Sequence, residues 1–442
     1  MDYGRNENRV GGEGKDERMT MNFSDYLSQE WVPALGCTEP ASIALAAARA
    51  ASEAEGRVVR VALNVDPKIY KNCYAVGIPN SFHKTGILWA AAIGANLPDA
   101  ELGLESFRAV TPEILGRAGE LIDSNGVEVE VDPSLTELKI GCTVVRERGI
   151  GRAVIAGDHT NFVLIERDGK TIFEKSASLA SDKSTLRKEI AEMEISGLVA
   201  LARSIGREDR KRLRDGIALN IRIAEHGLTL LPRRFVDLAA DEELTKISKL
   251  VCAGVYARMC GEDFPVMSLA GSGNKGIVTS VPTAMHGNNA GAGDGKTEEA
   301  LALACLVTSA TTHHLGSLSA VCGCSNAAGI GLAAGLVLMG GGGPQEIGLA
   351  INNMVGNVTG MICDGAKIGC ALKTMTAVDA AFRASSLALD GLGIPVTDGI
   401  VGESGQASLK NLGRIANLGM LSTDAEILSI MNEKLKARHG RP

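Results

Sequence analysis

The sequence has few aromatic residues and no block of basic residues. Aromatics make up 3% of the 442 residues, whereas glycine occurs 53 times. A core must therefore be built from Ala, Val, Ile and Leu, with helices approaching closely over Gly and Ala. The net charge is −7 and the Lys and Arg residues are dispersed, which argues against nucleic acid as a partner.

The chain also begins without an apolar leader. Residues 1–20 are polar, and we expect a disordered tail there. The most apolar stretch, 320–339, is interrupted by Cys324-Ser325-Asn326 and no basic flank follows it, so it predicts a buried helix rather than a membrane span. Ten cysteines without a secretion signal argue against a disulfide scaffold. We expect a cytoplasmic protein with no membrane partner.

Strand patterns fill the first part of the chain and helical patterns the rest. Alternating, valine-rich segments predict strands, among them 57–65 and Asn72–Ile78, and Asp168-Gly169 predicts a hairpin turn. The sequence thus predicts an α+β fold, in which a mixed α/β region over 21–180 precedes a predominantly helical region over 181–438. The Gly/Ala-rich helices of the second region make a homodimer plausible.

Three cysteines far apart in the sequence each precede a helical pattern. Cys37 precedes an alanine run, Cys322 precedes a small-residue helix that Ser325 is suited to cap, and Cys363 is followed by Asp364 as a potential cap. Free N–H groups and the positive end of the helix dipole meet at such positions. We expect this setting to lower a thiol pKa and to favour an anionic cluster.

Spacing alone does not decide between a metal site and three buried thiols. There is no pair of CxxC motifs, so the ligand spacing of zinc fingers does not apply. Cys324 and Cys370 each lie near one of the three cysteines and are possible further ligands. On spacing alone, buried and inert thiols are the simpler interpretation.

Three other segments suggest chemistry. Ala290–Thr297 fits a relaxed phosphate-loop pattern, but Pro282–Asn289 separates it from the strand expected at Ile277–Val281, so a nucleotide-binding protein is only an alternative. Gly271–Gly276 could form a nest of N–H groups that binds anions, or a plain loop. Gly157–Asn161 places a histidine at a strand end, as an acid–base candidate or as a structural turn. No single lysine stands out as the residue that would form a Schiff base with pyridoxal phosphate.

Four motifs resemble the L-cysteine desulfidase family, which is related to the α chain of iron–sulfur L-serine dehydratases. They are GCTEPASIALA (Gly36–Ala46), GSGNKGIVTSVP (Gly271–Pro282), LSAVCG (Leu318–Gly323) and GMICDGAKIGCALK (Gly360–Lys373). The resemblance implies a [4Fe–4S] cluster held by Cys37, Cys322 and Cys363. Cys322 is preferred over Cys324 because it is the cysteine of the LSAVCG-like segment.

The resemblance further implies a lyase that converts L-cysteine and water to sulfide, ammonia and pyruvate. The related dehydratases place a C-terminal cysteine on the cluster, whereas this chain ends in KLKARHGRP, which favours cysteine over serine as the substrate. Their Ser-His-Thr substrate loop has its nearest counterpart in His159-Thr160. We therefore expect His159 to be catalytic and the substrate to be bound by Thr160, Asn161, Ser272 and Asn274. A serine dehydratase and a non-catalytic cluster-binding sensor remain alternatives.

Overall fold

The computed structural model describes residues 21–98, 100–135, 137–175, 182–237, 242–316 and 319–439. The tail expected over residues 1–20 and the boundary expected near residue 180 lie outside these ranges. Within them, no helix combines the length and the apolar character needed to cross a membrane.

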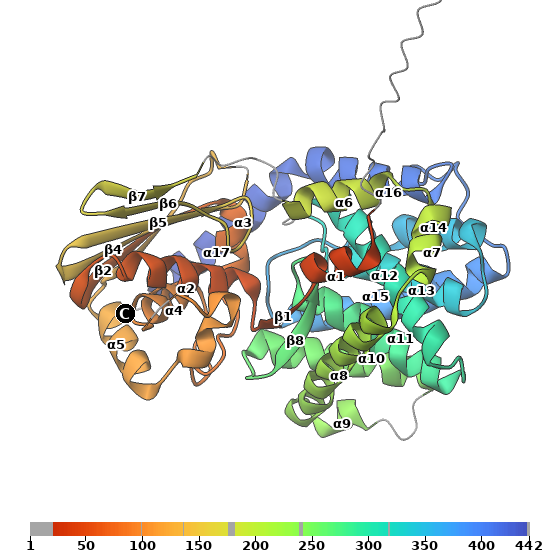
Figure 1. Ribbon diagram of the computed structural model, residues 1–442, viewed down its shortest axis with the longest axis horizontal. Helices are drawn as coiled ribbons and strands as arrows, with labels where there is room; N and C mark the ends of the chain where they lie inside the picture. The colour runs from red at the N-terminus through yellow and green to blue at the C-terminus, as the bar shows by residue number, and fades with distance from the viewer. Residues whose placement is uncertain are drawn as a thin grey trace, which may run out of the picture.

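The fold is α+β, as predicted, with a sheet-containing part and a helical part side by side (Figure 1). The sheet has the strand order β3-β2-β4-β5-β6-β7, in which β2 and β3 are parallel and the other pairs are antiparallel. Its strands are β2 (Glu55–Val65), β3 (Val127–Val131), β4 (Lys139–Arg148), β5 (Ile150–Ala156), β6 (Phe162–Arg167) and β7 (Lys170–Glu174). The predicted turn at Asp168-Gly169 is confirmed, and both residues have positive φ.

Short helices pack against this sheet. They are α2 (Thr38–Ala51), α3 (Pro67–Cys73), α4 (Ile87–Ala95), the 3-10 helix η1 (Gly103–Ala109) and α5 (Pro112–Asp123). Alanines and the apolar strand residues of β2, β4 and β5 form one hydrophobic core, in which Ile43, Val61 and Ile140 are fully buried. Small side chains let α2 and α4 approach closely, because a Cβ at Gly94 would lie 2.5 Å from the backbone of Ala44.

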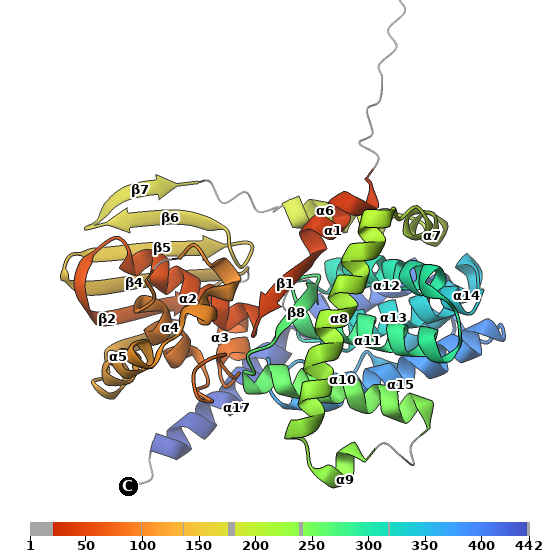
Figure 2. The same cartoon turned by 60° about the horizontal axis from the view of Figure 1, so that its bottom comes forward.

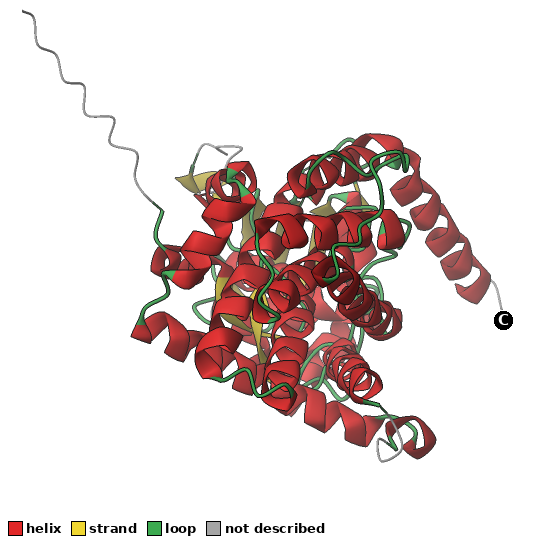
Figure 3. Cartoon of the chain, turned by 90° about the vertical axis from the view of Figure 1, so that its right-hand side faces the viewer, coloured by secondary structure: helices red, strands yellow, loops and turns green. Residues whose placement is uncertain are grey.

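The helical part has its own core. Its elements are α1 (Phe23–Glu30), β1 (Trp31–Leu35), α6 (Asp182–Glu192), α7 (Ile195–Arg203), α8 (Arg207–Leu230), α9 (Arg233–Val236), α10 (Glu243–Cys260), β8 (Pro265–Leu269), α11 (Gly273–Asn289), α12 (Asp294–Leu315), α13 (Asn326–Met339), α14 (Pro344–Val358), α15 (Gly369–Leu389), α16 (Gly405–Arg414), the π-helix η2 (Ile415–Gly419) and α17 (Leu421–His439). Every residue of α13 is buried, so the buried helix predicted over 320–339 is confirmed for Asn326–Met339, while residues 320–325 form the loop before it. Figure 3 shows these helices in front of the sheet.

The chain crosses between the two parts immediately before Cys37. Although α1 and β1 come first in the sequence, they pack in the helical core, and β1 pairs antiparallel with β8 from Trp31↔Leu269 to Leu35↔Pro265. The next helix, α2, belongs to the sheet-containing part (Figure 2). The C-terminal helix α17 returns to pack against α3. Cys37 therefore lies at the junction of the two parts.

Two predicted strands are wrong. Asn72–Ile78 begins in α3 and continues as a loop, because Asp66 caps that helix and Pro67 occupies its first turn. Ile277–Val281 lies within α11, which continues past Pro282. A proline inside a helix costs about 3 kcal/mol, but Gly273–Thr283 is buried throughout, so packing outweighs that cost.

The close approach of α8 and α10 generates a stability prediction. A Cβ at Gly227 would lie 2.0 Å from the carbonyl oxygen of Ala253. Gly227→Ala should therefore lower the free energy of unfolding by about 1–3 kcal/mol, as overpacked cores do. Gly116→Ala is the matched control, since nothing lies within 4 Å of the added atom. Chemical denaturation should show the first variant destabilised and the second unchanged or stabilised; equal stability of the two would contradict the packing described.

Candidate functional site

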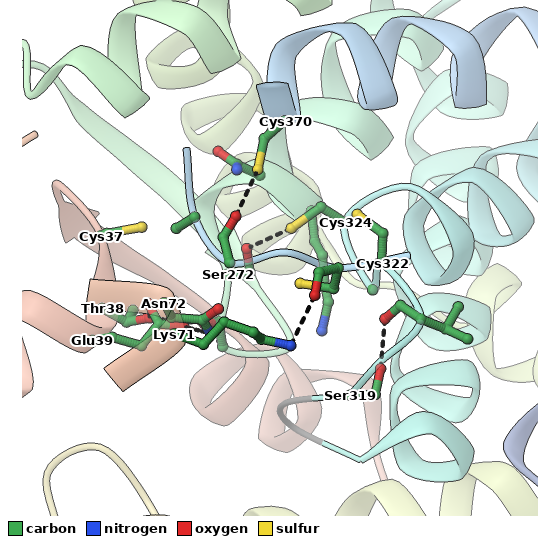
Figure 4. A pocket seen from close by; sticks show the side chains of 18 of the residues that line it. Cys37, Thr38, Glu39, Lys71, Asn72, Ser272, Ser319, Cys322, Cys324 and Cys370 are labelled. Carbon is green, nitrogen blue, oxygen red and sulfur yellow. Dashed lines mark hydrogen bonds between the residues drawn. The ribbon is translucent and has the colours of Figure 1, made fainter. Parts of the chain in front are cut away.

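A small cavity of about 80 Å³ lies where the two parts meet (Figure 4). Ligand pockets for drug-sized molecules are typically 300–1,000 Å³, so this cavity suits a small amino acid or an inorganic group rather than a nucleotide. The sheet-containing part supplies residues from the start of α2, from α3 and from the β5–β6 loop. The helical part supplies the rest. The lining includes Cys37, Thr38, Glu39, Lys71, Asn72, His159, Arg258, Gly271, Ser272, Asn274, Lys275, Ser319, Val321, Cys322, Gly323, Cys324, Cys363, Gly365 and Cys370.

Cys37 is the N-cap residue of α2, as the sequence predicts. The preceding Gly36 has φ +71°, and a Cβ there would lie 2.7 Å from Pro79, so the turn into Cys37 requires glycine. The Arg258 guanidinium donates to the Gly36 carbonyl at 2.6 Å and lies 3.6 Å from Cys37 Sγ. An arginine of the helical part thus fixes the first thiol of the sheet-containing part.

Cys322 and Cys363 lie on two loops that hydrogen-bond to each other. The Cys322 N–H donates to the Met361 carbonyl at 2.8 Å, and the Cys363 N–H donates to the Ala320 carbonyl at 2.7 Å. These two bonds form a short antiparallel bridge around Val321 and Ile362. The two cysteines are brought together although 40 residues separate them in the sequence.

We predicted that Cys37, Cys322 and Cys363 each lie just before a helix, and this prediction holds less well for Cys363 than for Cys37 and Cys322. Ser325 is the N-cap residue of α13, but α15 begins only at Gly369, so Asp364 is not its cap. Gly365 has φ +93°, and a Cβ there would lie 2.2 Å from the Lys71 carbonyl oxygen. The loop therefore lies directly against α3. Lys71 Nζ donates to the Cys363 carbonyl at 2.8 Å and pairs with Asp424 of α17.

Two further thiols face the same cavity. Cys324 Sγ lies 3.4 Å from the Ser272 hydroxyl, and Cys370, on α15, contacts the Gly365 carbonyl at 3.7 Å. Figure 4 shows Cys37, Cys322, Cys324 and Cys370 around one space. Five of the ten cysteines therefore line a single cavity.

Burial keeps these thiols protonated in the absence of a metal. It raises the pKa of Cys37 to about 12, although Arg258 opposes the shift. It also raises the pKa values of Cys322 and Cys363, to which neighbouring thiols contribute. The expectation that helix starts lower these pKa values is wrong, because desolvation exceeds the effect of nearby positive charge. Thiolates would form here only as a metal displaces their protons.

Cysteine thiols are the ligands that hold iron–sulfur clusters, so the cysteines that line this cavity fit such a group by their chemistry. Across the residues that the structure covers, no three His, Cys, Asp or Glu side chains are arranged to hold one ion. A single zinc needs all its sulfurs about 2.3 Å from one point, whereas an iron–sulfur cluster binds each thiolate through a different iron atom. Within the described part of the chain, three buried polar atoms of lining residues, Asn72 Oδ1, His159 Nε2 and Arg258 Nε, also lack hydrogen-bond partners.

The N-terminal residues of two helices, α2 and α11, line the cavity. The first N–H groups of a helix have no intrahelical acceptor, and neither Cys37 of α2 nor Ser272 of α11 caps its helix with its side chain. Glu39 is buried and accepts from Thr38 Oγ1 at 3.0 Å and from Asn72 Nδ2 at 2.9 Å. The cavity thus offers N–H groups for an anion and a carboxylate for a cation.

The predicted substrate-binding residues divide into two groups. His159, Ser272 and Asn274 line the cavity, and Asn274 Oδ1 accepts from Arg258 at 3.0 Å. Thr160 and Asn161 do not: the Thr160 hydroxyl bonds to Asp158 and the Asn161 amide to the Ala156 carbonyl, so both close the β5–β6 turn. Gly271–Gly276 is the start of α11 and therefore presents N–H groups without being a separate nest.

Sequence reasoning missed several cavity residues. Lys71 and Arg258 carry no motif, because each becomes functional only through contacts made far away in the sequence. Glu39 and Lys275 lie inside recognised motifs, and their burial at 8% and 4% exposure is the signal that distinguishes them. Buried charges at a cavity are expected where function requires them.

The phosphate-loop pattern does not form a phosphate loop. Ala290–Gly293 is the turn between α11 and α12, Asp294–Thr297 is the first turn of α12, and a helix rather than a strand precedes the segment. Glu298 pairs with Arg210 and Arg214 beside this turn. Its geometry is that of a helix–helix connection.

Most of the chain is similar in sequence to known proteins. Residues 167–429 match the family described as serine dehydratase alpha chain. A UPF0597 protein of Clostridium tetani is 38% identical over 414 residues, which cover 93% of this chain and 98% of that protein. UPF0597 proteins of Caldanaerobacter subterraneus and Geobacter sulfurreducens are each 36% identical over 421 residues, with the same coverage.

The cavity predicts which cysteines retain iron. Cys37→Ser, Cys322→Ser and Cys363→Ser should each lose most iron after anaerobic reconstitution, and lose activity by more than the 10–100-fold typical of a supporting group. Serine retains the size but is a poor ligand at neutral pH. Iron and sulfide assays with absorbance spectra are the measurement.

Cys142 and Cys305 are matched controls, since both are fully buried and neither lines the cavity. Their serine variants should keep full iron. Cys324→Ser and Cys370→Ser test the assignment itself: if Cys324 proves essential and Cys322 dispensable, the choice within that pair is wrong. If Cys370→Ser also removes iron, a fourth thiolate is present.

The segment Ala290–Thr297 gives a separate prediction. Lys296 is exposed in the first turn of α12, so Lys296→Met should leave thermal stability and activity unchanged, and ATP should not raise the melting temperature. A ligand that binds only the folded state at 100 times its Kd stabilises by about 2.7 kcal/mol. An ATP-dependent shift that Lys296→Met abolishes would contradict this interpretation.

Proposed function

Since this chain belongs to the serine dehydratase alpha chain family, we propose that it is an iron–sulfur lyase that eliminates sulfide from L-cysteine to give pyruvate and ammonia. The observation that carries the proposal is the convergence of Cys37, Cys322 and Cys363, from three separate segments, on one small cavity. The resemblance of the motifs around these cysteines to the L-cysteine desulfidase family supports the substrate.

The three cysteines would hold a [4Fe–4S] cluster, and an iron without a protein thiolate would supply Lewis acidity to the substrate. Arg258, hydrogen-bonded to Gly36 and close to Cys37, favours the thiolate form of Cys37. Lys71 supports the Cys363 loop through its carbonyl. These two cations offset part of the negative charge that bound thiolates bring into a buried site.

The remaining lining suits the two charged ends of an amino acid. The N–H groups at the start of α11, with the Ser272 hydroxyl, would receive the substrate carboxylate. Glu39, which already accepts from Thr38 and Asn72, would receive the ammonium. The unpartnered Nε2 of His159 faces the cavity from the opposite part of the molecule and would complete the polar contacts.

The reaction removes a proton from Cα and sulfide from Cβ. The electron pair of the Cα–H bond forms the Cα=Cβ bond as the Cβ–S bond breaks, and the sulfur leaves with both electrons of that bond. The aminoacrylate product tautomerises to an imine, and water hydrolyses the imine to pyruvate and ammonia. L-Serine shares the carboxylate, the amine and a β leaving group, so a serine dehydratase is the alternative activity.

Activity on the two amino acids tests the proposal. Anaerobically purified protein should be brown and should form pyruvate and sulfide from L-cysteine, with a kcat/KM at least about tenfold higher than for L-serine, a difference of about 1.4 kcal/mol. A coupled pyruvate assay and a sulfide assay on the same sample provide the measurement.

Each other outcome has a definite meaning. Faster turnover of L-serine would assign a dehydratase to the same site. A loaded cluster with no turnover of either amino acid would favour a non-catalytic sensor. A colourless protein that takes up no iron would contradict the cluster assignment.

A further inference from the structure

Lys275 is a buried lysine on the wall of the cavity. It lies in the first turn of α11, between Asn274 and Gly276, and its side chain is 4% exposed. A Cβ built on Gly323 would lie 3.5 Å from Lys275 Cε, an ordinary van der Waals distance, so the lysine side chain packs beside the Cys322–Cys324 loop. Lys275 has no carboxylate ion-pair partner in the part of the chain that the structure covers.

Two hydrogen bonds fix the amine. Nζ lies 3.1 Å from the Ala270 carbonyl oxygen and 2.9 Å from Thr312 Oγ1. The carbonyl can only accept, and the Thr312 hydroxyl donates its own proton to the Thr308 carbonyl at 2.8 Å. Lys275 must therefore donate in both bonds. A neutral amine has two N–H groups and one lone pair, so these bonds use both N–H groups and leave the lone pair free.

The surroundings shift the amine toward its neutral form. Burial lowers the pKa of Lys275 to about 8, and Arg187 lowers it further, whereas Cys324, Glu30 and Glu39 oppose the shift. Glu30 is itself paired with Arg187 at 3.0 Å, which reduces its effect on the lysine. A lysine whose pKa lies close to neutral pH exchanges protons readily at that pH, whereas an ordinary lysine with a pKa of about 10.4 does not.

We propose that Lys275 is the catalytic base that removes the Cα proton of the substrate. This role rests on the lyase activity proposed above. The Cα–H bond breaks, its proton bonds to the Nζ lone pair, and its electrons form the Cα=Cβ bond as sulfide departs. The resulting ammonium keeps its two existing hydrogen bonds and returns the proton to water or to the released products.

His159 is the competing candidate, and its ring is less well oriented. Its backbone carbonyl accepts from Ser42 at 2.6 Å, but among the residues that the structure describes its buried Nε2 has no hydrogen-bond partner. A general base normally has its orientation fixed by a third group. Lys275 has two such groups, the Ala270 carbonyl and the Thr312 hydroxyl. We therefore assign His159 to substrate contact and Lys275 to proton removal.

Exchange of the Cα hydrogen separates this role from binding. L-Alanine has no β leaving group, so the loaded enzyme in D₂O should exchange its Cα proton without elimination, and proton NMR follows the loss of that signal. Lys275→Met should slow exchange at saturating L-alanine by at least about 100-fold, the lower end for acid–base catalysis. Iron content and the Kd for L-alanine, measured by calorimetry, should change little.

Three further proteins complete the experiment. Lys275→Ala with added ethylamine should regain part of the exchange, because the free amine replaces the missing base. Lys296→Met should exchange as the parent protein does, and His159→Ala should retain the exchange while binding more weakly. If Lys275→Met fails to take up iron, the ethylamine experiment decides alone, and failure of the amine to restore exchange overturns the proposal.

The same experiment distinguishes failure of this role from failure of the proposed function. A parent protein without cluster or turnover would fail at the level of function. A functional parent whose Lys275→Met variant exchanges within about threefold of it would overturn only the role of Lys275. Weaker binding with unchanged exchange at saturation would instead place Lys275 on the substrate carboxylate and also overturn the proposal.

The protonation of Lys275 can also be measured on the full chain before iron and sulfide are added. This measurement does not depend on enzyme activity. Competitive acetylation by acetic anhydride, followed by peptide mass spectrometry across pH, reports when the Lys275 amine becomes neutral. The midpoint should lie near pH 8. A midpoint at or above about 10.4 would mean an ordinary charged lysine and would contradict its use as a base.

Discussion

The short backbone bridge between the Cys322 and Cys363 loops is the contact on which the site depends. Two N–H···O bonds, from Cys322 to Met361 and from Cys363 to Ala320, hold two thiols side by side. Cys37 reaches them because β1 pairs with β8 in the helical part before the chain crosses to the sheet. Arg258 and Lys71 then tie each part to the cysteine loop of the other. The cavity exists only while the two parts stay together.

Burial has two consequences at this junction. It raises the pKa values of the thiols, so they are stable in the protonated form until a metal replaces their protons. It lowers the pKa of Lys275 by the same physical effect, since desolvation disfavours whichever form is charged. A single buried cavity can therefore both protect the proposed metal ligands and provide a base. Among the described residues, buried polar atoms of Asn72, His159 and Arg258 have no hydrogen-bond partner, as expected where a ligand binds.

Much of this arrangement could be predicted from local sequence, and the rest depends on tertiary contacts. The alternation of valines predicted strand β2 closely, the Asp168-Gly169 signal predicted the β6–β7 turn, and Cys37 is at a helix start as expected. The strand predicted at Ile277–Val281 failed because burial on all sides carries α11 through Pro282. The predicted shifts of the thiol pKa values had the wrong sign, because the depth of burial is not visible in the sequence. Lys71, Arg258 and Lys275 were missed for the same reason: each acquires its role from a partner more than 35 residues away.

The central claim is that three thiolates from Cys37, Cys322 and Cys363 hold a four-iron cluster with one iron left for substrate. Mössbauer spectroscopy of ⁵⁷Fe-reconstituted protein tests it most directly, because each iron reports its own ligands. The account predicts one iron site distinct from the other three, and a change at that site alone when L-cysteine is added. Four equivalent irons that do not respond to L-cysteine would contradict it.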